Sequence, residues 1–140
     1  MGAGVLNTYS DLLPVTSSTP LITMGEGDTP SVKSNRLGRE LGCSELYFKL
    51  EGCNPTGSFK DRGMVVAIAK ALEEGTKAIM CASTGNTSAS AAAFGAYCDI
   101  PTFVLIPKGE VAMGKLAQAM IYGAKVIMIN GNFDIALGLV

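Results

Sequence analysis

Histidine is absent from this sequence. Within the chain, this excludes a Ser-His-Asp triad, a Cys-His catalytic pair and a histidine-ligated metal site. Proton transfer must then depend on lysine, carboxylates, tyrosine or cysteine. The four cysteines contain no CxxC pair, so neither zinc binding nor thioredoxin-type chemistry is expected. We predict no metal site.

Charged residues and long apolar runs are also scarce. The 140 residues carry 11 basic and 12 acidic side chains, for a net charge of −1. Neither nucleic acid nor an anionic membrane is therefore expected as the main partner. No apolar run approaches the length of about 20 residues that spans a membrane, and the first residues lack a secretory signal. We expect a cytoplasmic protein with free thiols.

Helical and strand patterns alternate along most of the chain. Residues 1–30 are rich in Ser, Thr, Pro and Gly and are expected to form surface loops. This alternation predicts an α/β fold with a parallel sheet and helices on both faces. The expected helices are 33–41, 61–74, 86–97, 111–122 and 133–140, and the expected strands are 46–50, 78–81, 102–106 and 125–129.

The first polar turn, from Asn54 to Asp61, reads Asn-Pro-Thr-Gly-Ser-Phe-Lys-Asp and leads into an expected helix. Ligands of open parallel sheets bind beyond the carboxyl ends of strands, and helix N-termini attract anions. Ser58 and Asp61 have the spacing of a capping box, which puts Lys60 in the first helical turn. A cation there opposes the helix dipole, and a neutral amine can attack an aldehyde. The alternative is a surface lysine beside Asp61 and Arg62.

The same turn has the glycine spacing of a phosphate loop. Gly52 and Gly57 are separated as in a Walker A motif, which continues with Lys-Ser or Lys-Thr. Here Ser58 and Phe59 follow, and Lys60 comes two positions late. Nucleotide hydrolysis is therefore disfavoured.

A second polar turn, Ser83-Thr-Gly-Asn-Thr-Ser88, follows the strand expected at 78–81. It offers four hydroxyls, one amide and several backbone donors within six residues. Such a set suits a carboxylate or a phosphate. An ordinary N-cap of the following Ala-rich helix is the alternative, although one polar residue would satisfy it.

Together the two turns resemble the fold-type II pyridoxal phosphate enzymes, and the threonine synthases most closely. Residues 25–30, Gly-Glu-Gly-Asp-Thr-Pro, resemble the family's GEGxTP segment, although Ser31 stands where leucine is usual. Residues 49–64 match the family's Schiff-base segment, and residues 82–93 match its asparagine loop. The resemblance covers nearly the whole chain.

The resemblance implies roles for particular residues. Lys60 would hold pyridoxal 5'-phosphate as a Schiff base and shuttle protons, Asn86 would hydrogen-bond the cofactor's phenolic oxygen, and Phe59 would lie beside the cofactor. The implied reaction is that of a lyase, which converts O-phospho-L-homoserine and water to L-threonine and phosphate. A homodimer is expected for the full-length enzyme. Candidates for binding the substrate's carboxylate or phosphate are Ser83, Thr84 and Thr87.

Related enzymes differ at specific positions. Threonine and serine dehydratases resemble SFKxRGA followed by SAGNHAQG, whereas this chain has Met64 in the first motif and Asn86-Thr-Ser88 in the second. Cysteine synthases resemble SxKDR followed by TSGNTG, whereas this chain has Phe59 and Ser88. These lyases are alternatives, as is a non-catalytic α/β module that binds anions.

The chain ends at Ala136–Val140, inside an apolar helical pattern. The family's glycine-rich loop for the cofactor phosphate, and the Ser or Thr that faces the pyridine nitrogen, are not recognisable in the sequence. We therefore expect a fragment that is inactive alone. Residues 1–50 would belong to the large domain and 51–140 mainly to the small mobile domain, with the remainder of the large domain absent.

Overall fold

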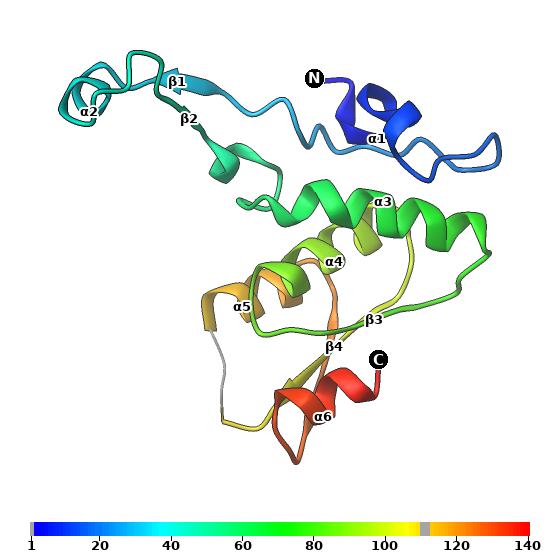
Figure 1. Ribbon diagram of the computed structural model, residues 1–140. Helices are drawn as coiled ribbons and strands as arrows, with labels where there is room; N and C mark the ends of the chain where they lie inside the picture. The colour runs from blue at the N-terminus through cyan, green and yellow to red at the C-terminus, as the bar shows by residue number, and fades with distance from the viewer. Residues whose placement is uncertain (1, 110–112) are drawn as a thin grey trace.

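The computed structural model describes residues 2–109 and 113–140 (Figure 1). Among these residues, no helix is both long enough and apolar enough to cross a membrane. In chain order the elements are α1 (Gly4–Thr8), the 3₁₀ helix η1 (Ser10–Leu12), β1 (Ser31–Lys33), α2 (Asn35–Glu40), β2 (Tyr47–Lys49), the 3₁₀ helix η2 (Glu51–Cys53), α3 (Lys60–Glu73), β3 (Ile79–Ala82), α4 (Asn86–Tyr97), β4 (Thr102–Pro107), α5 (Met113–Ile121), β5 (Lys125–Ile129) and α6 (Phe133–Gly138).

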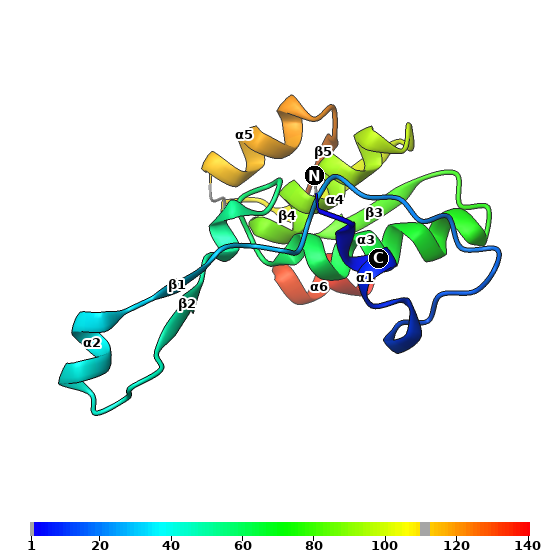
Figure 2. The same cartoon turned by 90° about the horizontal axis from the view of Figure 1, so that it is seen from above.

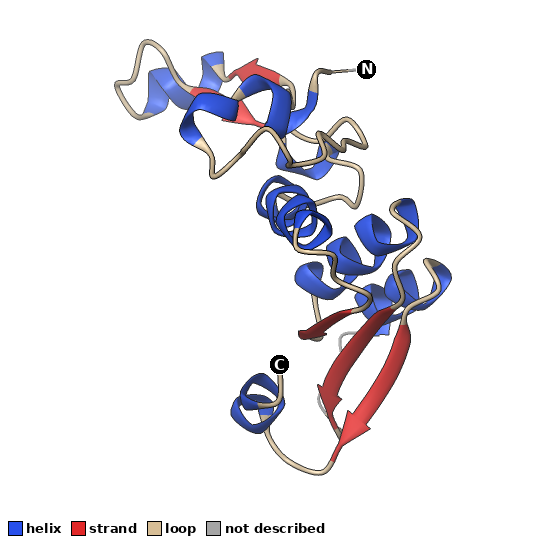
Figure 3. Ribbon diagram, turned by 90° about the vertical axis from the view of Figure 1, so that its right-hand side faces the viewer, coloured by secondary structure: helices blue, strands red, loops and turns tan. Residues whose placement is uncertain are grey.

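A parallel sheet with the strand order β3-β4-β5 forms the centre of the body. Its middle strand, β4, is buried along nearly its whole length, because helices cover the sheet on both faces. This burial explains the nearly continuous apolar run of the strand. Helices α4 and α5 cover one face and α6 covers the other (Figure 3). The predicted parallel sheet with helices on both faces is confirmed.

Helix α4 lies between α3 and the sheet, and it is buried on both sides. On the α3 side, Phe94 is fully buried with Val65 and with Leu6 of α1. Gly95 faces the strand layer, where an added Cβ would overlap the Thr102 hydroxyl. The small side chains of α4 therefore allow close packing on two sides. The sheet-side cluster contains Ala92, Val104, Ile106, Leu116, Ala119 and Ala124.

The N-terminal residues depart from the expected surface loops. Val5 and Leu6 of α1 are buried in the core. The fully buried Glu26 carboxylate accepts hydrogen bonds from Val5 N and Thr23 Oγ1, both at 3.0 Å. It thereby satisfies a free N–H group at the start of α1. A helix of five residues is too short to show a 3.6-residue pattern, so its formation depends on these tertiary contacts.

The strand expected at 46–50 lies outside the parallel sheet. As β2, it pairs antiparallel with β1, which the sequence pattern did not predict, with Val32 opposite Phe48. Together with α2, the two strands form an arm that extends from the body (Figures 1 and 2). The expectation that the Lys60 turn follows a strand of the main sheet is therefore wrong, since a short apolar run does not specify its pairing partner.

The remaining predicted elements form close to their expected bounds. The expected helix 33–41 is shorter, because Lys33 belongs to β1. The helix expected at 111–122 corresponds to α5, and its expected first residues, 111 and 112, lie outside the described residues. All four cysteines are free thiols.

Candidate active site

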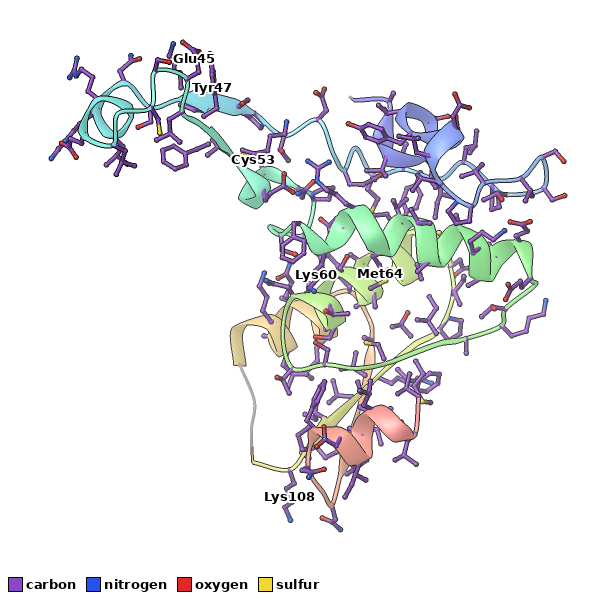
Figure 4. The ribbon with its side chains drawn as sticks, in the orientation of Figure 1. Glu45, Tyr47, Cys53, Lys60, Met64 and Lys108 are labelled. Carbon is purple, nitrogen blue, oxygen red and sulfur yellow. The ribbon has the colours of Figure 1, made fainter. Side chains whose placement is uncertain are left out.

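Lys60 is the first residue of α3, and its side chain is exposed. Its Nζ lies 4.8 Å from the centre of the Phe59 ring, a cation–π distance, and that ring is 56% exposed. Figure 4 shows Lys60 one turn before Met64 on the same helix. The predicted place of Lys60 in the first helical turn is confirmed. Because the side chain is exposed, the amine is open to an approaching ligand.

The next residue, Asp61, is fully buried. Its carboxylate accepts hydrogen bonds from Thr56 N at 2.8 Å, Thr56 Oγ1 at 2.6 Å and Ser90 Oγ at 2.6 Å. Two of these bonds come from the polar turn itself, and the third comes from α4. Asp61 therefore ties the turn before Lys60 to a second helix.

The predicted capping box between Ser58 and Asp61 is wrong. Asp61 bonds to Thr56, and Ser58 Oγ accepts a bond from Lys60 N at 3.3 Å. The cause is the backbone at Gly57, whose φ of +80° reverses the chain and brings Thr56 over the helix start. A capping box with a single N-cap residue does not describe this turn.

Asn86 is the first residue of α4, and it is exposed like Lys60. In the turn before it, Ser83 Oγ accepts a bond from Gly85 N at 3.2 Å. Thr84 and Thr87 are half-buried, and a Cβ added at Gly85 would meet nothing within 4 Å. Within residues 2–109 and 113–140, the side chains of Asn86, Thr84 and Thr87 make no hydrogen bond and are available to a ligand.

The starts of α3 and α4 lie side by side (Figure 1). The bond from Ser90 to Asp61 joins the first turn of α3 to the second turn of α4, and Ser90 is one helical turn from Asn86. The fold thus brings the two polar turns together through the packing of α3 against α4, and not through two strands of one sheet. Both N-termini favour negative charge in the same region.

A partly buried ion pair also holds the start of α3. Arg62 Nε and Nη2 donate to the two carboxylate oxygens of Glu51, both at 2.8 Å. Arg62 Nη2 also donates to Thr29 Oγ1 at 3.1 Å. The hydrogen bonds from Arg62 lower the pKa of Glu51 to about 2. The segment Gly-Glu-Gly-Asp-Thr-Pro is therefore linked to the Lys60 helix through Thr29, a contact that no sequence pattern predicted.

Helix α5 also contacts the first turn. Gln118 Nε2 and Lys115 Nζ donate to the carbonyl oxygen of Thr56, at 3.1 and 3.3 Å. Lys115 Nζ would be 3.9 Å from a Cβ at Gly57, so a second amine lies close to the Lys60 turn. Sequence reasoning missed both residues, because they are about 60 positions from the turn and no local pattern singles them out.

The available groups fit pyridoxal phosphate. Lys60 offers an amine for the aldehyde, Asn86 an amide for the phenolic oxygen, and Phe59 an exposed ring for the pyridine face. All three side chains are exposed. A hollow of about 460 Å³ lies elsewhere, on the arm, between Lys33 and Ser44.

Sequence comparison identifies the family. Residues 22–140 match the family model described as pyridoxal-phosphate dependent enzyme. The chain is 58% identical to a threonine synthase of Halalkalibacterium halodurans, over 98% of this chain and 38% of the relative. It is 55% identical to a threonine synthase of Methanocaldococcus jannaschii, over 94% of this chain and 33% of the relative.

Solved structures of pyridoxal phosphate-dependent and related enzymes have a similar fold. A pyridoxal 5'-phosphate-dependent aspartate racemase matches with a TM-score of 0.70 and 30% identity, over 79% of this chain and 36% of that one. Threonine deaminase isoform 2 from Solanum lycopersicum matches with a TM-score of 0.70 and 25% identity, over 80% and 32%. Maize serine racemase matches with a TM-score of 0.68 and 28% identity, over 76% and 32%.

The chain spans only about a third to two fifths of the length of these threonine synthases, 38% and 33%. Within that span, the family model covers the arm, the Lys60 turn, the Asn86 turn and the parallel sheet. The fold is the α/β arrangement of the fold-type II enzymes. The chain belongs to the family of pyridoxal-phosphate dependent enzymes.

Proposed function

We propose that the protein containing this chain is a threonine synthase. It would be a pyridoxal phosphate-dependent carbon–oxygen lyase that converts O-phospho-L-homoserine and water to L-threonine and phosphate. The observation that carries this proposal is the 58% identity to a curated threonine synthase over 137 residues, a span that takes in both Lys60 and Asn86. Its cytoplasmic location and its assembly as a homodimer are parts of the same proposal.

Lys60 is the residue proposed to hold the cofactor. Its side chain is exposed at the start of α3, where its amine can reach an aldehyde and form a Schiff base. When bound, the cofactor supplies an electron sink for a carbanion of the substrate. The amine of Lys60 would then accept and return protons at the substrate's carbon atoms.

The other proposed roles belong to residues around Lys60. Asn86 would orient the cofactor through its amide, and Phe59 would cover one side of the ring. Proposed contacts to the substrate's carboxylate or phosphate are the hydroxyls of Ser83, Thr84 and Thr87. We also propose that residues 51–140 belong mainly to a mobile small domain and residues 1–50 to a large domain.

Reduction with borohydride tests the role of Lys60. The longest protein that the reading frame encodes is loaded with pyridoxal phosphate, reduced and mapped by mass spectrometry of its peptides. We expect the label on Lys60, its loss in Lys60→Arg, and its retention in Lys77→Arg, which changes an exposed lysine after α3. A label scattered over several lysines would favour a non-catalytic anion-binding module.

A substrate panel tests the reaction. The neighbours with solved structures include a threonine deaminase and a serine racemase, so threonine and serine are the relevant competitors of O-phosphohomoserine. Met64 and Ser88 depart from the dehydratase pattern and support the phosphorylated substrate. We expect phosphate release from O-phosphohomoserine. Formation of a keto acid from threonine or serine, without phosphate release, would contradict the proposal.

A further inference from the structure

Asp61 joins the two helices that carry Lys60 and Asn86. Oδ1 accepts from Thr56 Oγ1 and from Ser90 Oγ, each at 2.6 Å, and Oδ2 accepts from Thr56 N at 2.8 Å. The carboxylate is fully buried, and Ser90 is fully buried as well. Both oxygens therefore accept hydrogen bonds, and Oδ1 has donors from two different parts of the chain.

The three hydrogen bonds to the Asp61 carboxylate are costly to break. A buried carboxylate without donors is costly, and hydroxyl donors at 2.6 Å to a charged oxygen are short and strong. The first turn of α3 also favours the negative charge of Asp61. A shift of α3 relative to α4 would break the bond from Ser90, so the carboxylate holds the two helices in one relative position.

The relative position of α3 and α4 matters because the bond between Asp61 and Ser90 lies next to both Lys60 and Asn86. Asp61 is the neighbour of Lys60 in sequence, and Ser90 is four residues after Asn86, on the same face of α4. Fixing Asp61 against Ser90 therefore fixes the backbone from which the Lys60 amine and the Asn86 amide extend.

We infer that Asp61 is a positioning residue, which acts through Thr56 and Ser90 to set the separation between Lys60 and Asn86. The inference rests on the proposed function, because it concerns how these two side chains meet one cofactor. Asp61 itself is buried and does not touch the ligand. A merely structural role would predict lower stability without any change in how the cofactor is held.

Two variants test the link, and each removes one of the two hydroxyl groups that donate to the Asp61 carboxylate. Ser90→Ala removes the donor from α4, and Thr56→Val removes the donor from the turn while keeping the Thr56 N–H. The matched control is Thr102→Val. Thr102 is 5% exposed, and its hydroxyl donates to Ile100 O at 3.3 Å near the other end of α4. All are made in the longest protein that the reading frame encodes.

The first readout needs no cofactor. Amide hydrogen exchange of the cofactor-free protein compares residues 56–62 with residues 86–90. In Ser90→Ala, we expect exchange to rise roughly tenfold in both segments, since the change on α4 frees the turn before α3. In Thr102→Val, neither segment changes. A rise confined to 86–90 would overturn the inference.

The second readout uses bound pyridoxal phosphate. Its dissociation constant should rise roughly tenfold in Ser90→Ala and in Thr56→Val, and its visible circular dichroism per bound molecule should decrease, because the ring orientation is no longer fixed. Thr102→Val should lower the melting temperature alone. If all three variants lose stability yet bind the cofactor as the wild type does, Asp61 is structural and the inference is wrong.

The same measurements separate this inference from the proposed function. If the wild type carries a borohydride label at Lys60 and Ser90→Ala behaves like Thr102→Val, only the positioning role fails. If the wild type carries no label at Lys60, the proposed function fails, and the positioning role fails with it. If Ser90→Ala does not fold, the comparison of Thr56→Val with Thr102→Val decides the outcome.

Discussion

Arg62 in the first turn of α3 donates two hydrogen bonds of 2.8 Å to the carboxylate of Glu51, which lies eleven positions earlier in the chain. The guanidinium and carboxylate are each less than a third exposed. This ion pair connects η2, which follows the arm, to the helix that carries Lys60. It also provides the most direct test of how the start of α3 is held.

Replacing Arg62 by lysine should lower the free energy of unfolding by about 1–2 kcal/mol, because an ammonium cannot form the two-pronged contact with Glu51. Urea denaturation of the longest encoded protein measures the change. Arg36→Lys is the control, since Arg36 pairs with Glu40 in an exposed ion pair and should change stability by less than about 0.5 kcal/mol. Equal losses in both variants would contradict the assigned role of the Glu51 contact.

The ion pair also predicts a pH dependence. Hydrogen bonds from Arg62 lower the pKa of Glu51 from 4.5 to about 2. A lowered folded-state pKa contributes stability above the unfolded value, and this contribution is lost as pH falls from about 4.5 to about 2. Wild type should therefore exceed Glu51→Gln in stability at pH 7, with the difference shrinking across that window. Chemical denaturation at several pH values, with the exposed Glu40→Gln as control, tests the trend; a constant difference would exclude it.

Asn86→Ala should weaken pyridoxal phosphate binding roughly tenfold, because the proposed hydrogen bond from Asn86 to the cofactor is lost. Fluorescence titration of the full-length protein measures the dissociation constant. Asn132→Ala is the control. Asn132 Oδ1 accepts a bond from Ile135 N at the start of α6, so this variant should lose about 1 kcal/mol of stability without a change in affinity. An unaltered affinity in Asn86→Ala would remove Asn86 from the proposed site.

Gly95→Ala should destabilise the protein by about 1–2 kcal/mol, although alanine is the better helix former. The added methyl would overlap Thr102 Oγ1, and it would lie close to the Ile100 carbonyl. Thermal or urea denaturation measures the loss. Adding Thr102→Ala should recover part of it in a double-mutant cycle, since the overlapping hydroxyl is removed. Strictly additive losses would show that the overlap does not govern this position.

The sequence alone predicted several features for definable reasons. Alternating apolar patterns specified the parallel strands β3, β4 and β5 and the helices between them, because periodicity reflects local burial. The two polar turns predicted that Lys60 and Asn86 stand near the starts of helices, as the structure has them. These are short-range properties, and each is encoded in fewer than about 20 consecutive residues.

Tertiary structure decided what the local pattern could not. It paired β2 with β1 in the arm, buried α1 through Glu26, and gave the Asp61 carboxylate to Thr56 and Ser90 in place of the expected capping box. Each of these depends on chain segments that are distant in sequence or on a backbone reversal at a glycine. The candidate residues Lys60 and Asn86 can thus be named from the sequence. The relative position of the helices that carry them follows only from the packing of α3 against α4, since no local rule specifies long-range contacts.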